Sequence, residues 1–300
     1  MTEEKLISIV LPVYNGAAHM AGSVESILNQ TYQNWELIIV NDCSTDETLE
    51  IAKAYQKKDP RIRVLSNERN LKLPSTLNVG FAEAKGEYYT WTSDDNMYMP
   101  EALSRLAQEL SLDRDCVMVY SNMTDIDADG KEIATVNRLG PEYIVTGNVI
   151  GASFLYRAET ARQIGGYDAN LFLAEDYDYW IRIYCSGKLK HIDESLYYYR
   201  RHAGSLTETK RAAVGMQTYR ALEKNFLPLY ADAKRHGMQY FLFDQMLHRA
   251  GDEQAEQTMQ LLCAVNAGYK SYLCKKIFKA KLSASIIGKV LKALKGTEQI

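Results

Sequence analysis

The feature that most constrains the fold is an alternation of short apolar runs with segments of helical periodicity over the first 121 residues. Five runs are rich in β-branched or aromatic residues: 6–13, 36–41, 62–66, 88–93 and 116–121. Runs with so little polar alternation are typical of strands that are buried on both faces. Between them, apolar residues such as Leu103, Leu106 and Leu110 recur at helical spacing. The order predicts an α/β fold with a mostly parallel sheet and helices on both faces.

Composition narrows the class of protein. The 300 residues are 46% hydrophobic and 24% charged, and the formal net charge is -3. These values fit one large globular domain, or a domain with an appendage, and give no reason to expect a nucleic-acid partner. Five scattered cysteines without CxxC spacing indicate neither a disulfide framework nor a zinc cluster. The start of the chain does not resemble a signal peptide, and no apolar stretch approaches the roughly 18 residues of a membrane span. We therefore expect a cytoplasmic location.

Polar segments follow three of the predicted strands: "PVYN", "NDCSTD" and "SDDN". In open α/β sheets, ligands bind beyond the carboxyl ends of the strands, so these segments should converge. Neither GxGxxG nor GxxxxGK[ST] is present, so the commonest glycine-rich phosphate loops are absent. A bound divalent cation would turn the repulsion between Asp94 and Asp95 into a shared attraction. The alternative is a solvated loop that carries two acids. After the second strand, Ser44 and Glu47 have the spacing of a capping box.

Several ordered motifs resemble the family 2 inverting glycosyltransferases, which have the GT-A fold. Residues 8–51 and 84–100 are similar to the nucleotide-binding half of that family, and residues 151–183 and 197–207 to its acceptor half and end. The resemblance implies a GT-A fold, a Rossmann-like sheet with helices on both faces. It also implies a catalytic domain over residues 1–207.

The resemblance up to residue 207, and helical periodicity beyond it, predict a domain division with three parts. Residues 1–100 form the nucleotide-sugar half, residues 101–207 the acceptor half, and residues 208–300 a helical extension. The extension ends in a segment with many lysines, 270–295, whose apolar residues share one helical face. Such a helix suits peripheral contact with an anionic membrane, or packing on the catalytic domain or on a second subunit of a homo-oligomer.

The resemblance assigns donor-binding roles. Asp42 matches the acid that accepts the imide N–H of uracil. Tyr14, with Pro12, matches the place where the base rests against the protein, and Lys72 lies where it could meet a phosphate. Other interpretations remain: Asp42 as an acid favoured by a helix N-terminus, and Tyr14 as a turn tyrosine packed on the sheet edge. The segment with Lys72 also contains Asn78, which could shape the floor of the donor site.

The resemblance also predicts a divalent cation, Mn²⁺ or Mg²⁺. Asp95 matches a metal ligand, and Asp94 is better placed for the ribose or a bridging water. Many relatives have a further acid where this chain has Thr92, so coordination would fall mainly on Asp95 and the donor diphosphate. His202 matches a histidine near the diphosphate or the metal, although it could be an ordinary loop histidine. Arg200 and Arg201 could neutralise phosphate or pair with surface acids.

Inverting transfer is one in-line displacement, so a base must face the leaving group across the sugar. Asp176 in "LAEDYDYWIRI" matches the base of the family. Glu175 and Asp178 are rivals in the same motif, and all three could instead be acids favoured at a helix start.

The predicted activity is metal-dependent transfer of a hexose or N-acetylhexosamine from a UDP-sugar, or less expectedly a dTDP-sugar. The acceptor would be a hydroxyl of a surface glycan or a lipid-linked glycan. The alternative is a non-catalytic assembly subunit that binds a nucleotide sugar, or no nucleotide at all. Thr92, and Leu77 where many relatives have arginine, keep that alternative open, whereas Asp42, Asp95 and Asp176 together argue for an enzyme.

Overall fold

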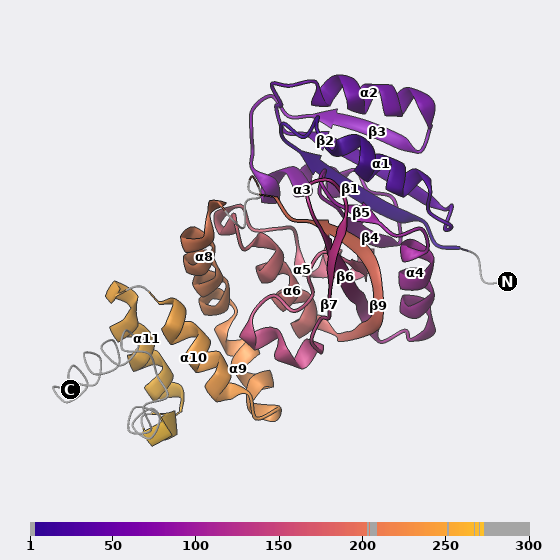
Figure 1. Ribbon diagram of the computed structural model, residues 1–300. Helices are drawn as coiled ribbons and strands as arrows, with labels where there is room; N and C mark the ends of the chain where they lie inside the picture. Colours follow the sequence, from indigo (N-terminus) through magenta and orange to yellow (C-terminus); the bar gives the residue numbers. More distant parts are fainter. Residues whose placement is uncertain are drawn as a thin grey trace.

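A single mixed sheet of nine strands forms the centre of the computed structural model (Figure 1). The structure describes residues 4–202, 204, 209–250, 252–266, 268, 269, 271 and 272. The elements in chain order are β1 (Ile7–Val13), α1 (Met20–Leu28), β2 (Trp35–Asn41), α2 (Thr48–Lys58), β3 (Ile62–Ser66), α3 (Leu73–Ala82), β4 (Tyr88–Trp91), β5 (Met97–Tyr98), α4 (Ala102–Leu112), β6 (Cys116–Ile126), β7 (Glu132–Val136), the 3-10 helix η1 (Pro141–Thr146), β8 (Phe154–Arg157), α5 (Ala158–Ile164), the 3-10 helix η2 (Ala169–Leu171), α6 (Glu175–Ser186), β9 (Lys188–Arg200), α8 (Arg211–Lys224), α9 (Phe226–Arg235), α10 (Gln239–Arg249) and α11 (Asp252–Val265).

The first half of the sheet is parallel, as the apolar runs predict. Its order is β3-β2-β1-β4, and Ile7 of β1 lies between Trp35 of β2 and Tyr88 of β4. Every residue of β1 and β2 is buried. These strands show no polar alternation because helices cover both of their faces.

The second half of the sheet is mixed. Strand β8 is antiparallel to both β4 and β6, β9 is parallel to β6, and β5 is antiparallel to β9. Strand β7 forms a hairpin with β6 and is almost wholly exposed. Strands β5, β7, β8 and β9 are not among those that the sequence predicts. Two of them lack a buried apolar run, since β7 faces solvent and exposed positions recur along β9.

The two faces of the sheet belong to two hydrophobic clusters. Ile9 and Leu11 of β1 point to the cluster that contains residues of α1, α2 and α4, whereas Val10 points to the cluster that contains α3, α5 and α6. This alternation follows from the two-residue period of a strand. The predicted fold class, with helices on both faces, is confirmed.

The described residues after 208 lie mostly in helices. Helices α8 and α9 pack against α6, and α10 packs against η1, all away from β1 to β3 (Figure 1). Their residues Tyr219, Phe226 and Phe243 belong to the same core cluster as Trp180 of α6. None of the helices in the described ranges is long and apolar enough to cross a membrane. The predicted basic helix over residues 270–295 lies almost entirely outside the described residues.

Candidate active site

The loops after β1 and β2 are joined by hydrogen bonds at the carboxyl edge of the sheet. The amides of Asn15 and Gly16 donate to Ser44 Oγ (3.0 Å) and Thr48 Oγ1 (2.9 Å), and the amide of Thr45 donates to Asn15 Oδ1 (2.8 Å). The predicted capping box is wrong: Ser44 bonds the neighbouring loop, and Asp46 Oδ1 accepts the N–H of Thr48 at the start of α2 (3.1 Å). These hydrogen bonds join the loops after β1 and β2 into a single rim of the candidate site.

Asp42 lies directly after β2 and is 4% exposed. Its Oδ1 accepts the N–H of Leu71 and the side-chain amide of Asn67, both at 2.8 Å, and its Oδ2 accepts the N–H of Lys72 at 3.0 Å. Lys72 has a φ of 69°, a backbone region that side-chain-bearing residues rarely adopt. Asp42 therefore holds the loop before α3. Because Oδ2 has a single partner among the described residues, it retains a lone pair for a further N–H donor.

The other predicted donor-binding residues frame this rim. Pro12 is buried within β1, and Tyr14 directly after β1 is 51% exposed. The side chain of Lys72 is also exposed. Pro12 and Tyr14 therefore belong to the β1 side of the rim, and Lys72 to the segment that Asp42 holds.

Asp94 follows β4 and packs tightly against the first loop. A Cβ added at Gly16 would lie 2.0 Å from Asp94 Oδ2, so the close approach requires glycine there. Burial, and then the neighbouring charge of Asp95, raise the pKa of Asp94 to about 7. The repulsion that the sequence predicts between these acids is present.

Asp95 has two unlike carboxylate oxygens. Its Oδ2 lies 2.9 Å from His202 Nε2, whereas its buried Oδ1 has no hydrogen-bond partner among the described residues. A buried oxygen without a partner is costly and calls for an explanation such as a bound ion. The pairing of Asp95 with His202 brings together two residues that are 107 positions apart.

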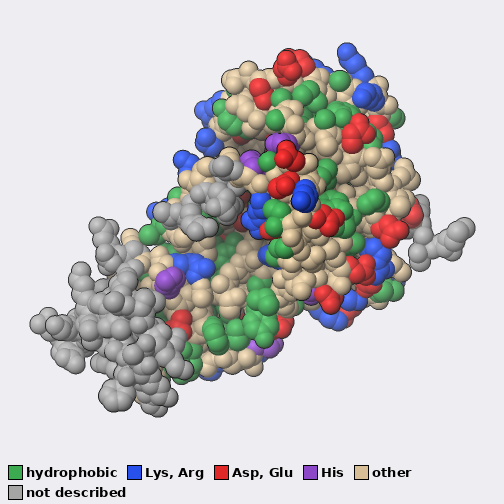
Figure 2. All heavy atoms as spheres, in the orientation of Figure 1, with side chains coloured by type: hydrophobic (Ala, Val, Ile, Leu, Met, Phe, Trp, Pro, Cys, Tyr) green, Lys and Arg blue, Asp and Glu red, His purple; other side chains and the backbone are tan. Residues whose placement is uncertain are grey.

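His19, at the start of α1, belongs to this cluster and was missed from the sequence. Its ring centroid lies 5.8 Å from that of His202. Burial, and then the positive charge of Arg200, lower the pKa of His19. Figure 2 shows histidine and acidic side chains gathered on the same face. No sequence pattern marks His19, because only the fold brings the end of the first loop to the end of β9.

Thr92 and the two arginines have structural partners. Thr92 is buried, with its Oγ1 2.5 Å from the hydroxyl of Tyr197. Arg200 Nε donates to the backbone oxygen of Asp95 at 3.0 Å. Arg201 forms an ion pair with Asp125 at 2.8 Å. Arg201 therefore pairs with an acid, which is one of the two roles that the sequence left open.

A second pair of acids begins α6. Glu175 is 4% exposed, and its Oε2 accepts the N–H of Leu173 at 2.6 Å. Asp176 Oδ2 accepts the side-chain amide of Asn148 at 2.8 Å, and its Oδ1 accepts the N–H of Tyr177 at 2.6 Å. Burial, and then the charge of Asp176, raise the pKa of Glu175 to about 8. Burial also raises the pKa of Asp176, although the hydrogen bonds to the N–H of Tyr177 and to Asn148 oppose it. With a pKa of about 8, Glu175 is predominantly protonated near neutral pH.

Asp178 has a different environment. Its side chain is fully buried and accepts hydrogen bonds from Arg182 Nε (2.9 Å), Lys224 Nζ (3.1 Å) and Asn225 Nδ2 (2.8 Å). These partners link α6 to α8 and to the start of α9. Asp178 is therefore a structural residue, with no accessible oxygen for an acceptor.

The comparisons with known proteins agree with this architecture. The model of Glycosyl transferase family 2 matches residues 8–165. An uncharacterized glycosyltransferase of Rickettsia prowazekii is 34% identical over 233 residues, which are 74% of this chain and 71% of that protein. The chain belongs to glycosyl transferase family 2.

A longer relative and solved structures extend the comparison. An uncharacterized glycosyltransferase of Rickettsia felis is also 34% identical, over 64% of this chain, but the chain spans only about a third of its length. A structure of S. aureus TarS in complex with UDP-GlcNAc has a TM-score of 0.59 at 15% identity, and covers 88% of each chain. At that identity the likeness shows the fold alone, and it supports the GT-A architecture.

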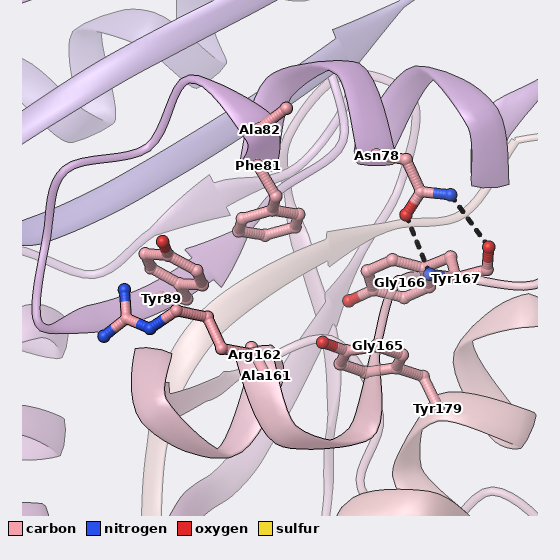
Figure 3. Close-up of a pocket in the computed structure, with 10 residues that line it drawn as sticks. All are labelled: Asn78, Phe81, Ala82, Tyr89, Ala161, Arg162, Gly165, Gly166, Tyr167 and Tyr179. Carbon is pink, nitrogen blue, oxygen red and sulfur yellow. Dashed lines mark hydrogen bonds between the residues drawn. The ribbon is translucent and has the colours of Figure 1, made fainter.

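The cavity in Figure 3 is separate from the acid pairs of this family 2 glycosyltransferase. It measures about 270 Å³, lies between α3 and α5, and has Tyr167 and Tyr179 stacked in its wall. Asn78 also lines it and exchanges two hydrogen bonds with the backbone of Tyr167, at 2.7 and 2.8 Å. Leu77 is fully buried in the core beside it. Asn78 and Leu77 thus support the packing of α3, and no candidate acid lines the cavity.

Proposed function

We propose that this family 2 glycosyltransferase is an inverting, metal-dependent enzyme. It transfers a hexose or N-acetylhexosamine from a UDP-sugar to a hydroxyl of a surface glycan or lipid-linked glycan. The observation that carries the proposal is the presence of two acid pairs with opposite surroundings in one GT-A fold. Residues 1–207 would form the catalytic domain and residues 208–300 a helical extension. The UDP-GlcNAc complex of TarS, a protein of the same fold, supports the choice of donor.

The rim formed by the first two loops would bind the nucleotide. Asp42 Oδ2, which retains a lone pair, would accept the imide N–H of uracil. Tyr14 and Pro12 would support the base, since the exposed ring of Tyr14 offers an apolar face. Asp94 would contact the ribose, and Lys72 a phosphate.

A divalent cation, Mn²⁺ or Mg²⁺, fits the acid pair Asp94–Asp95. The buried, unpartnered Oδ1 of Asp95 is an oxygen of the type these ions bind, and His202 Nε2 lies beside the same carboxylate. Within the described residues, no three Asp, Glu, His or Cys side chains converge on one point. Asp95 and His202 would therefore hold the ion with help from the donor diphosphate. When bound, the ion would neutralise the negative charge of the leaving nucleoside diphosphate.

Asp176 would act as the base. Both of its hydrogen bonds come from N–H donors, which stabilise a carboxylate, and the neighbouring Glu175, with a pKa of about 8, is predominantly neutral at pH 7. As the acceptor oxygen bonds to the anomeric carbon, the bond from that carbon to the diphosphate breaks. The hydroxyl proton passes to Asp176. The single displacement inverts the anomeric configuration.

Release of UDP from a panel of nucleotide sugars, with and without Mn²⁺, tests the proposal. We expect slow, metal-dependent release from one UDP-sugar, strongly reduced in Asp95→Ala and in Asp176→Asn. The exposed Asp115, distant from both acid pairs along the chain, provides the matched control variant Asp115→Asn. Absence of nucleotide binding in the native chain would contradict the proposal and favour the assembly subunit.

A further inference from the structure

We propose that Arg138 and Asn148 are positioning residues for Asp176: Arg138 fixes the backbone of the 147–151 segment, and Asn148 in that segment holds Asp176 Oδ2. This inference rests on the proposed function, in which Asp176 is the base. Neither residue belongs to the acid motifs. Both lie in the chain between β7 and β8.

The guanidinium of Arg138 is committed to backbone carbonyls. Its Nη2 donates to the oxygen of Asn148 at 2.6 Å, and its Nε donates to the oxygen of Val149 at 2.9 Å. The backbone N–H of Arg138 donates to Oδ1 of Asn122 on β6 at 2.8 Å. This bond anchors Arg138 to that strand. Among the described residues, no carboxylate forms a direct ion pair with Arg138. The partly buried guanidinium of Arg138 bonds two successive backbone oxygens. It therefore fixes the path of the 147–151 backbone and is not a surface ion-pairing group.

Gly151 closes the same segment around the guanidinium. Its φ is 78°, and a Cβ at this position would lie 3.0 Å from Arg138 Cζ. A larger residue would be strained by the backbone and crowded by the arginine. The N–H of Gly151 also donates to Asn148 Oδ1 at 3.1 Å.

This last bond fixes the orientation of the Asn148 amide. Because Oδ1 accepts from a backbone N–H, Nδ2 is the atom that faces Asp176, and it donates to Asp176 Oδ2 at 2.8 Å. The Asn148 side chain is therefore held at both ends. Rotation of the Asp176 carboxylate would break one of its two hydrogen bonds, so its orientation toward an acceptor hydroxyl is set by the segment.

Both residues also favour the charged form of the base. The groups that face Asp176 are Glu175 on its own helix, Arg138 and Asn148 from the 138–151 region, and Tyr167 from the turn after α5. Arg138 and Asn148 lower the pKa of Asp176, against the effect of burial. Loss of the Asn148 N–H should therefore raise that pKa and move the acid limb of the rate profile to higher pH.

Asn148→Ala tests the inference, with UDP release from the preferred UDP-sugar measured from pH 5 to 9. We expect kcat to fall about 10- to 100-fold, as for other residues that orient a functional group. The acid limb should shift upward, whereas the affinity for UDP stays within twofold of native. The exposed neighbour of Arg138 gives the control Asn137→Ala, which should match the native profile.

Two further variants keep the test decisive if Asn148→Ala is poorly folded. Asn148→Asp keeps the acceptor for Gly151 N–H but places a carboxylate against Asp176, so it should shift the acid limb further upward. Arg138→Lys keeps the charge but not the paired carbonyl contacts, so kcat should fall and the acid limb of the rate profile should shift less than in Asn148→Ala. A native profile in all three variants would overturn the inference. If Asp176→Asn releases UDP as fast as the native chain, the proposed base itself is wrong; if only that variant is inactive, the positioning role alone fails.

Discussion

The two acid pairs, Asp94–Asp95 and Glu175–Asp176, are alike in sequence but opposite in surroundings. In each pair, burial and the adjacent charge raise the pKa of the first acid, to about 7 for Asp94 and about 8 for Glu175. The second acids differ. Within the part of the chain that the structure describes, Asp95 has a histidine on one oxygen and no partner on the other, whereas both oxygens of Asp176 accept N–H donors.

The difference shows how one residue type can serve two chemistries. An unpartnered buried oxygen beside a histidine suits a cation, because the ion would replace the missing partner. A carboxylate held by neutral N–H donors, beside an acid that takes the proton, suits a base. The predictions below test whether this division of roles is correct.

The largest effect should come from removal of the base. Asp176→Asn retains the shape of the side chain but cannot accept the hydroxyl proton, so kcat should fall about 10²- to 10⁴-fold. The rate of UDP release from the preferred donor measures the effect, with Asp115→Asn as the control. Unchanged turnover would show that the second pair has no role in proton transfer.

The next effect should be on stability, and it separates Asp178 from the pair beside it. Asp178→Ala would leave Arg182 and Lys224 without their shared buried partner. We expect unfolding to become easier by up to about 3 kcal/mol, the low end for a broken buried ion pair, because Lys224 is 39% exposed and can be rehydrated. Chemical denaturation measures the change. A fully stable variant with strongly reduced kcat would instead make Asp178 a functional acid.

A smaller effect should follow from replacement of the cation ligand. Asp95→Asn keeps one oxygen but loses the charge, so the acceleration by Mn²⁺ should fall about 10- to 100-fold, as for other disturbed metal sites. Titration of the UDP-release rate with Mn²⁺ measures this, with the surface variant Asp115→Asn as the reference. If Asp95→Asn responds to Mn²⁺ as the native chain does, the ion binds elsewhere.

The smallest effect should come from Glu175→Gln. Since Glu175 is protonated near neutral pH, an amide should change kcat at pH 7 by no more than a few-fold. Stability should reveal the difference. The pKa of Glu175 in the folded chain, about 8, exceeds the ordinary value of 4.5, so between these pH values the folded chain binds more protons than the unfolded chain. The contribution of Glu175 to stability is therefore lost as the pH rises from 4.5 to 8. Tm measured from pH 4.5 to 8 should therefore fall less steeply in Glu175→Gln. Parallel curves would contradict the raised pKa.

The sequence predicts the buried parts of the fold best. Strands such as Ile7–Val13 are apolar throughout, so their pattern identifies them without further context. Strand Glu132–Val136 is exposed, and Lys188–Arg200 has exposed positions between buried ones, so neither has a comparable signal. A strand can thus be predicted from its own residues only where burial on both faces requires those residues to be apolar.

The candidate active site, too, could be predicted only where its residues belong to a local sequence motif. Asp94, Asp95 and Asp176 belong to ordered motifs, and the structure places each in a chemically distinct setting. The roles of Arg138 and Asn148 could not be predicted, because their partners come together only when the 138–151 segment folds onto α6. Likewise, the partners of Asp178 include residues 46 and 47 positions away.

Calorimetric binding of UDP to the native chain, Asp95→Asn and Asp176→Asn, each with and without Mn²⁺, tests the division of roles most directly. The account predicts that Mn²⁺ strengthens UDP binding equally in the native chain and in Asp176→Asn, and has little effect in Asp95→Asn. Equal loss of the Mn²⁺ effect in both variants, or its retention in Asp95→Asn, would contradict the claim that one acid pair serves the cation and the other the proton.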